Sequence, residues 1–254
     1  MILNLMSLMV DAGNTLTKWA LLEGADLKRG VSFSSDPHSL HKDLDNAWST
    51  LTPPKAILVS NVKGAEFRWA FDAWVFDRWG LGCHYLLSEA NALGVSNGYD
   101  DPQSLGVDRW LAILAARNAY PLPLCVVDCG TATTLDFLDA DGCHLGGLIA
   151  PGFHAMSQTL SVNTTLDVSS ALNSIGEFPG RVTGDCINLG ILLSTAGLID
   201  KAVASMKLRL KADVLVLLTG GDAEIVSPYL SVQHERVSDL IFRGMLLKAV
   251  DMGL

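Results

Sequence analysis

The chain has 254 residues, of which 49% are hydrophobic and 18% are charged, and its formal net charge at pH 7 is −9. This composition excludes a disordered chain and is that of a packed globular protein. The acidic balance without a basic run argues against a nucleic-acid partner, and the longest apolar runs are strand-sized, which argues against a membrane partner.

Five cysteines are spread along the chain, and no two of them form a C-x-x-C pair. An odd number without paired spacing fits reduced thiols better than a disulfide framework or a zinc site. The first ten residues are apolar but carry no basic segment and no clear cleavage site, unlike a signal peptide. We therefore expect a cytoplasmic protein.

The first predicted hairpin bends at Asp11–Thr15. A short apolar run ends at Asp11 and is followed at once by a glycine turn, which is typical of a buried strand. A second apolar run, Leu16–Leu22, ends at the turn Glu23–Gly24. The pattern predicts two strands with the functional residues at their bend.

Helices and strands alternate between this hairpin and the middle of the chain. We expect strands at 56–62 and 84–87, helices at 64–79 and 108–120, and a polar, glycine-rich loop at 88–106. The aromatic side chains of the helix at 64–79 are expected to pack in a core or an interface, with a ligand-stacking group as the alternative.

The second half of the chain repeats the hairpin. The strand 124–127 leads into Asp128, and Gly130–Thr131 forms the bend before another apolar run. Residues 146–152 are expected to close this hairpin and to begin a helix. The remaining expected elements are helices at 186–210 and 239–252, a strand at 213–218 and a glycine loop at 219–223.

The order of these elements predicts an α/β fold made of two related halves, residues 1–120 and 121–254, with a cleft between them. No linker rich in proline or serine separates the halves. We therefore expect them to be tightly joined.

Both bends have the residue types of a phosphate site. Glycine allows positive φ and close approach of the backbone, so that consecutive N–H groups can point toward an anion. Four side chains near the bends can add donors or positive charge: Thr15, Thr17, Thr131 and Lys18. The carboxylates of Asp11 and Asp128 would repel phosphates unless a cation such as hydrated Mg²⁺ lies between the carboxylate and the phosphates. One such segment alone is more simply turn chemistry, whereas two copies favour a phosphate site.

Five segments, taken in order, resemble the type III pantothenate kinases, which belong to the superfamily of actin, heat-shock ATPases and sugar kinases. The segments are Asp11–Lys18, Gly106–Arg109, Asp128–Asp136, Gly146–Gly152 and Thr219–Gly221. The resemblance spans nearly the whole chain. It implies duplicated actin-like, ribonuclease H-like half-domains with a nucleotide cleft, and a homodimer.

The resemblance also implies a reaction, in which ATP phosphorylates the primary hydroxyl of pantothenate to give 4′-phosphopantothenate, the first committed step toward coenzyme A. It implies ATP contacts at Asp11, Ala12, Gly13, Asn14, Thr15, Leu16, Thr17, Lys18 and Thr131. It implies pantothenate contacts at Tyr99, Gly106, Val107, Asp108, Arg109 and Thr183. Asp108 would be the catalytic base, Asp128 would bind a monovalent cation, K⁺ or NH₄⁺, and Asp11 would hold Mg²⁺ through water.

The chemistry of Asp108 and Arg109 agrees with these roles. A carboxylate at the start of a helix can accept the proton of a substrate hydroxyl, and an arginine beside it can bind a substrate carboxylate with two hydrogen bonds. The alternative is a helix N-terminal acid followed by a surface arginine.

Two other functions remain open at this level. The first is a sugar or other small-alcohol kinase of the same fold, because fold does not determine substrate. The second is a non-catalytic, nucleotide-binding regulator, which would be expected to have lost Asp11 or Asp108, yet the sequence retains both. A P-loop kinase is disfavoured because the chain has no G-x-x-x-x-G-K-[ST] motif.

Overall fold

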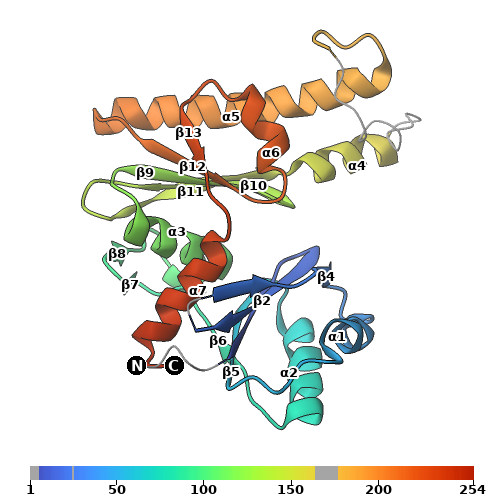
Figure 1. Ribbon diagram of the computed structural model, residues 1–254. Helices are drawn as coiled ribbons and strands as arrows, with labels where there is room; N and C mark the ends of the chain where they lie inside the picture. Colours follow the sequence, from blue (N-terminus) through green and yellow to red (C-terminus); the bar gives the residue numbers. More distant parts are fainter. Residues whose placement is uncertain (1–5, 25, 164–176) are drawn as a thin grey trace. The chain divides into compact units, whose positions relative to one another are not determined.

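A computed structural model describes residues 6–24, 26–163 and 177–254 of the chain (Figure 1). The chain divides into two compact units. Unit 1 consists of Met1–Leu93, Tyr99–Ala115 and Asp239–Leu254, and unit 2 of Gly94–Gly98 and Ala116–Ser238. The first five residues, part of the apolar start, lie outside the described residues.

The sheet of unit 1 combines a three-stranded meander with two parallel strands. Its strands are β1 (Ser7–Ala12), β2 (Leu16–Glu23), β3 (Asp26–Arg29), β4 (Phe33–Ser34), β5 (Ala56–Asn61) and β6 (His84–Tyr85). The strand order is β3-β2-β1-β5-β6, with β4 paired to β2. β1 runs antiparallel to β2 and parallel to β5, so the end of β1 lies between a hairpin bend and the end of a parallel strand.

Helices cover both faces of this sheet. They are α1 (Leu40–Trp48), α2 (Ala65–Trp79), the first part of α3 (Val107–Ala119) and α7 (Leu240–Asp251). Side chains alternate along β1, so Leu8 and Val10 pack with α1 and α2, while Met9 packs with α3 and α7 on the opposite face (Figure 1). The segment that carries Asp11 is therefore buried on both sides.

A cluster of aromatic rings fills the space between α1, α2 and the sheet. Trp48 is fully buried, and its ring lies within 6.0 Å, centroid to centroid, of the rings of Trp19, Phe33, Phe71, Trp74 and Trp79. Most aromatics of α2 therefore belong to the core, as expected, whereas Trp69 and Phe76 are exposed.

The sheet of unit 2 has the same topology as the sheet of unit 1. Its strands are β9 (Leu124–Cys129), β10 (Ala132–Leu138), β11 (His144–Pro151), β12 (Leu215–Thr219) and β13 (His234–Arg236). The order is β11-β10-β9-β12-β13, in which β9, β10 and β11 are antiparallel neighbours and β12 and β13 continue in parallel. This arrangement reproduces β3-β2-β1-β5-β6, so the duplication extends from the bends to the whole sheet.

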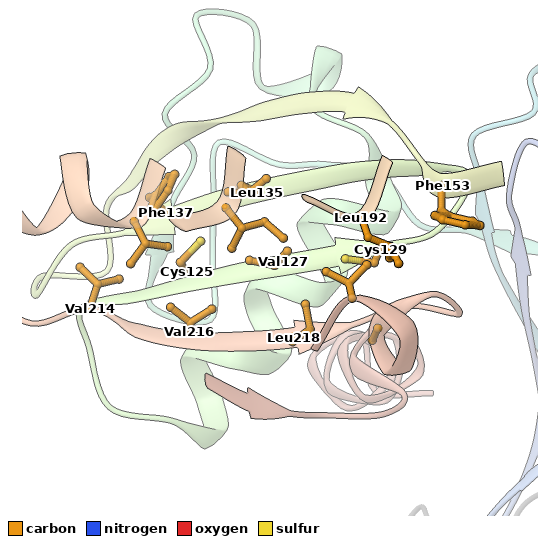
Figure 2. Packing of buried hydrophobic residues seen from close by; sticks show 14 of the residues in the cluster. Cys125, Val127, Cys129, Leu135, Phe137, Phe153, Leu192, Val214, Val216 and Leu218 are labelled. Carbon is orange, nitrogen blue, oxygen red and sulfur yellow. The ribbon is translucent and has the colours of Figure 1, made fainter. Parts of the chain in front are cut away.

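Three helices of unit 2 pack on one face of its sheet. They are α4 (Phe153–Asn163), α5 (Thr183–Leu210) and α6 (Ala223–Val226). Figure 2 shows Cys125, Val127 and Cys129 of β9 pointing to the same side as Leu135 and Phe137 of β10, next to Leu192 of α5. Among the described residues, α5 alone is long and apolar enough to cross a membrane, but half of its most apolar stretch is buried in this core.

Short elements complete the two units. They are β7 (Asn91–Ala92), β8 (Val95–Ser96) and the 3₁₀ turns Pro102–Ser104 and Ser227–Tyr229. Among the strands and α-helices of the first half, α1, β3, β4, β7 and β8 have no counterpart among the elements expected from sequence.

The prediction that residues 146–152 close a hairpin is wrong, whereas the helix expected directly after them is present as α4. Residues 144–151 form β11, and the helix begins at Phe153. Gly146 and Gly147 resemble a turn in the sequence, but Gly147 pairs with Asp136 of β10 and Gly146 has a φ of +94° beside a register shift. The glycines therefore form an irregularity within a strand.

The compact units differ in extent from the halves 1–120 and 121–254. Residues 239–254 belong to unit 1, because Phe242 and Met245 of α7 pack with Met9 and Leu58 of the first sheet. Residues 94–98 and 116–120 belong to unit 2. The division into actin-like half-domains stays a prediction.

Candidate functional site

The first bend places a buried carboxylate at the end of β1. Gly13 donates its backbone N–H to the carbonyl of Leu16 at 3.2 Å, which closes the turn. Asp11 is only 4% exposed, and Ser60 donates its hydroxyl to Asp11 Oδ1 at 3.0 Å. The parallel register of β1 and β5 sets Asp11 opposite Ser60, so the hydroxyl that holds the carboxylate comes from the neighbouring strand.

The residues of the first bend divide into exposed and supporting positions. Asn14, Thr15 and Leu16 are exposed at the tip, and Lys18 is half-buried. Thr17 is fully buried and its hydroxyl lies 2.9 Å from that of Ser35, so Thr17 supports the bend from within unit 1.

A lysine missed by the sequence analysis also reaches the first bend. Lys63 donates from Nζ to the carbonyl of Asn14 at 2.9 Å, which places an ammonium group at the tip. Lys63 follows the end of β5 by two residues. In the sequence, Lys63 is only a basic residue just after a predicted strand. Its place at the first bend follows from the pairing of β5 with β1, which the sequence alone does not give.

The second bend lies at the same place in its sheet as the first, but its loop is one residue shorter. Gly130 donates its N–H to the carbonyl of Ala132 at 3.1 Å, and Gly152 donates to the carbonyl of Thr131 at 3.0 Å. Thr131 is exposed. Asp128 lies opposite Thr219 of β12 in the parallel register, as Asp11 lies opposite Ser60. Each unit therefore has an aspartate beside a hydroxyl residue at the same place in its sheet.

A glycine loop packs directly against the second bend. Gly220 has a φ of +97°, and a Cβ added there would lie 2.4 Å from Asp128 Oδ1. The N–H of Asp222 donates to the carbonyl of Cys129 at 2.9 Å, which ties the loop to the end of β9. The absence of a side chain at Gly220 leaves room for the Asp128 carboxylate.

Negative charge accumulates at the second bend. Burial, together with the nearby carboxylates of Asp128 and Asp222, raises the pKa of the Cys129 thiol to about 12. His154 Nε2 lies 3.4 Å from Asp222 Oδ1. Two carboxylates around one buried thiol favour a cation at this place. Residues 6–24, 26–163 and 177–254 contain no group of three or more acidic, histidine or cysteine side chains that could hold a metal ion, so a cation at Asp128 would need further oxygens from the backbone, the substrate or water.

A third group of predicted residues lies at the start of α3. Asp108 is half-buried, and its Oδ1 accepts the backbone N–H of Arg109 at 2.8 Å. A Cβ added at Gly106 would lie 2.6 Å from that oxygen, so glycine is needed for the carboxylate to adopt this position. Arg109 is only 8% exposed.

Arg109 is joined to Tyr99 by two contacts. Its Nη1 donates to the hydroxyl of Tyr99 at 2.8 Å, and its guanidinium lies 5.6 Å from the centre of the Tyr99 ring. The structure thus brings together Tyr99, Asp108 and Arg109, which come from two separate segments. Thr183 is exposed at the first residue of α5, in unit 2, and its role stays a prediction.

Comparisons with known proteins decide the family. A sequence model described as "Type III pantothenate kinase" matches residues 7–205 of the chain. The chain belongs to the type III pantothenate kinase family. A type III pantothenate kinase of Nitrosococcus oceani is 33% identical over 256 residues, covering 97% of this chain and 94% of that protein. One of Burkholderia cenocepacia is 38% identical over 255 residues, covering 96% and 95%.

Membership in the type III pantothenate kinase family confirms the resemblance found in the sequence and makes the chain a kinase. It also supports the use of ATP and of a small-molecule substrate. The roles of individual residues, the metal ions and the homodimer stay predictions.

Solved structures confirm the predicted fold class of this chain. A chain of the PilM–PilN type IV pilus biogenesis complex has a TM-score of 0.58 at 13% identity, covering 97% of this chain and 99% of that chain. MreB 5 of Spiroplasma citri, in a structure bound to AMPPNP, has a TM-score of 0.52 at 12% identity, covering 98% and 99%. At such identities the likeness establishes the actin-like α/β fold alone.

Gly220→Ala is predicted to distort the second bend. The added Cβ would lie 2.2 Å from the carbonyl oxygen of Cys129, and the positive φ disfavours any side chain. We expect the free energy of unfolding, measured by urea denaturation, to fall by about 1–3 kcal/mol. Affinity for ADP, measured by calorimetric titration, should fall about tenfold, because the carbonyl and carboxylate at the bend must move.

Gly221→Ala is the matched control for this experiment. Among the described residues, no atom lies within 4 Å of a Cβ added at Gly221. This variant should change the free energy of unfolding by less than about 0.5 kcal/mol. Equal effects of the two substitutions would contradict the role assigned to Gly220.

Proposed function

We propose that this kinase transfers the γ-phosphoryl group of ATP to the primary hydroxyl of pantothenate, giving 4′-phosphopantothenate for coenzyme A synthesis. The family assignment carries this proposal. The contact between Tyr99 and Arg109, next to Asp108, supports it, because a base and a carboxylate-binding cation then lie side by side.

Asp108 is proposed to accept the proton of the pantothenate hydroxyl. As that O–H bond breaks, the oxygen forms a bond to the γ-phosphorus, and the bond between the γ-phosphorus and the bridging oxygen of ADP breaks. ADP leaves with the electron pair of that bond. The N–H of Arg109 donates to Asp108 Oδ1 and so helps to orient the carboxylate.

Arg109 is proposed to bind the carboxylate of pantothenate. A buried guanidinium is held in one orientation by the Tyr99 hydroxyl, and its planar group suits two parallel hydrogen bonds to a carboxylate. Gly106 and Val107 would line the same site, and Thr183 is a further pantothenate contact expected from the family resemblance.

The two bends are proposed to bind the phosphates of ATP. Asp11–Lys18 and Thr131 offer backbone N–H groups, hydroxyls and one ammonium group, and Lys63 adds a second ammonium group at Asn14. Asp11 would hold Mg²⁺ through water, and Asp128 would contribute to a site for K⁺ or NH₄⁺. Bound Mg²⁺ neutralises charge on the phosphate oxygens, which a loose phosphoryl-transfer transition state requires.

Two wider features belong to the same proposal. The kinase works as a homodimer and in the cytoplasm, both of which follow from the family resemblance and the reduced cysteines expected from sequence. Neither nucleic acid nor a membrane is a partner in this proposal.

Asp108→Asn is predicted to lower kcat for pantothenate by about 10²–10⁴-fold, because the amide cannot accept the proton. The dissociation constant for ADP should stay within about twofold, because Asp108 contacts the acceptor rather than the nucleotide. ADP release in a coupled assay measures the first quantity, and calorimetric titration the second.

Asp77→Asn, an exposed acid on α2, is the control and should retain wild-type kcat. Undiminished turnover by Asp108→Asn would exclude Asp108 as the base. A wild-type enzyme that phosphorylates sugars but not pantothenate would overturn the substrate, and a wild type that transfers phosphate to no small alcohol would favour a nucleotide-binding regulator.

The cation proposed at Asp128 predicts activation by potassium. Turnover in a potassium buffer should exceed turnover in a sodium buffer of equal ionic strength, and Asp128→Asn should remove most of that difference. Steady-state rates at saturating ATP and pantothenate measure it. Equal rates in both buffers would show that Asp128 does not bind an activating potassium ion.

A further inference from the structure

One lysine of the C-terminal helix is buried and makes two ion pairs. Lys248, near the end of α7, is 6% exposed. Its Nζ lies 2.8 Å from Glu89 Oε1 and 2.7 Å from Asp251 Oδ2. Burial acts to lower the pKa of Lys248, but the hydrogen bonds to Asp251 and Glu89 outweigh burial and raise the pKa above its ordinary value. Lys248 therefore remains charged at neutral pH.

The two partners of Lys248 differ in what they connect. Asp251 lies on α7 itself, three residues away, so this pair joins no separate parts of the chain. Glu89 lies in the segment that follows β6, so the pair with Glu89 joins α7 to a distant part of the sequence.

Glu89 stands at the beginning of residues 88–106, which we name the acceptor segment. The two ends of this segment are tied together, because Ser88 donates its buried hydroxyl to the carbonyl of Leu105 at 2.7 Å. Tyr99 lies within the segment, and Gly106 ends it immediately before α3. Because Glu89 is next to Ser88, holding Glu89 in place also helps to hold the two ends of the acceptor segment together.

The helix that carries Lys248 is itself in close contact with α3. A Cβ added at Gly244 would lie 2.1 Å from the carbonyl oxygen of Leu111, so the backbones of α7 and α3 touch there. Met245 and Phe242 of α7 share a core cluster with Leu111, and with Leu86 just before the acceptor segment. α7 therefore contacts the helix whose first turn carries Asp108 and also holds the start of the acceptor segment.

We propose that Lys248 is a positioning residue for the acceptor substrate. Its ion pair with Glu89 fixes the position of the acceptor segment relative to α3. This inference rests on the proposed function, because Tyr99, Asp108 and Arg109 are the groups that would be aligned. Through Glu89, α7 fixes where Tyr99 stands relative to Arg109, and so the geometry in which the acceptor carboxylate and hydroxyl are bound.

Lys248→Met tests the proposal, because methionine keeps most of the buried alkyl chain and removes both ion pairs. We expect KM for pantothenate to rise roughly fivefold, with KM for ATP unchanged, since a partly exposed pair of this kind is worth about 1 kcal/mol. Amide hydrogen exchange of peptides from residues 88–93 and 99–106 should become faster in the same variant without any substrate.

Asp251→Asn is the matched control, because it removes only the pair within α7 and leaves the one to Glu89. It should retain the wild-type KM for pantothenate and wild-type exchange of the acceptor segment. Glu89→Gln, a change at a half-exposed side chain that leaves the core intact, should reproduce Lys248→Met even if the methionine variant folds poorly.

Two outcomes would overturn the positioning role. In one, Asp251→Asn and Lys248→Met behave alike, which would indicate that Lys248 only stabilises α7. In the other, Glu89→Gln changes neither exchange nor KM. An inactive wild-type protein would instead count against pantothenate phosphorylation, because the exchange measurement needs no turnover.

Discussion

The site depends on a buried carboxylate that is held by a hydroxyl across a pair of parallel strands. Asp11 is nearly inaccessible, and a buried carboxylate is costly unless hydrogen bonds or cations compensate it. Ser60 supplies one hydrogen bond, and it can do so only because β5 lies parallel to β1 in a register that pairs the two residues. The register in turn requires the cores on both faces of the sheet, since a slip by one residue would exchange the faces.

The second unit builds the same arrangement with different surroundings. Asp128 faces Thr219 as Asp11 faces Ser60, and both sheets have the same strand order. Around the first bend a lysine binds the Asn14 carbonyl, whereas around the second bend Asp222 approaches the end of β9. This difference agrees with the proposal that both bends bind phosphate and that the second bend also contributes to a cation site.

Sequence predicted the parts of the fold that local pattern determines. The hairpins at Asp11 and Asp128 were predictable because an apolar run, an acid and a glycine follow one another. The helix α1 was missed although Leu40, Leu44 and Trp48 recur at helical spacing and form its buried face. Residues 146–147 misled the prediction, because glycines in a strand and glycines in a turn look alike without the pairing partner.

The acids and glycines of the candidate site were predictable from the sequence, but the residues that hold them in place were not. Asp108 and Arg109 stand out as neighbours, whereas the contact of Arg109 with Tyr99 spans ten residues and requires the fold. Ser60 and Lys63 reach the first bend because β5 pairs with β1. Lys248 forms its ion pair with Glu89 across a long separation in sequence. Contacts between distant segments depend on tertiary structure, which periodicity and spacing do not report.

The most direct test of this account is calorimetric titration of AMPPNP, with and without Mg²⁺, into wild type and Asp11→Asn. Asparagine keeps the size of the side chain and can still accept the Ser60 hydrogen bond, so the fold should persist. The account predicts that Mg²⁺ strengthens binding to wild type and that Asp11→Asn loses this effect and about tenfold in affinity, as expected for a charge that acts through the ion. Equal affinity and equal Mg²⁺ dependence in the two proteins would contradict it.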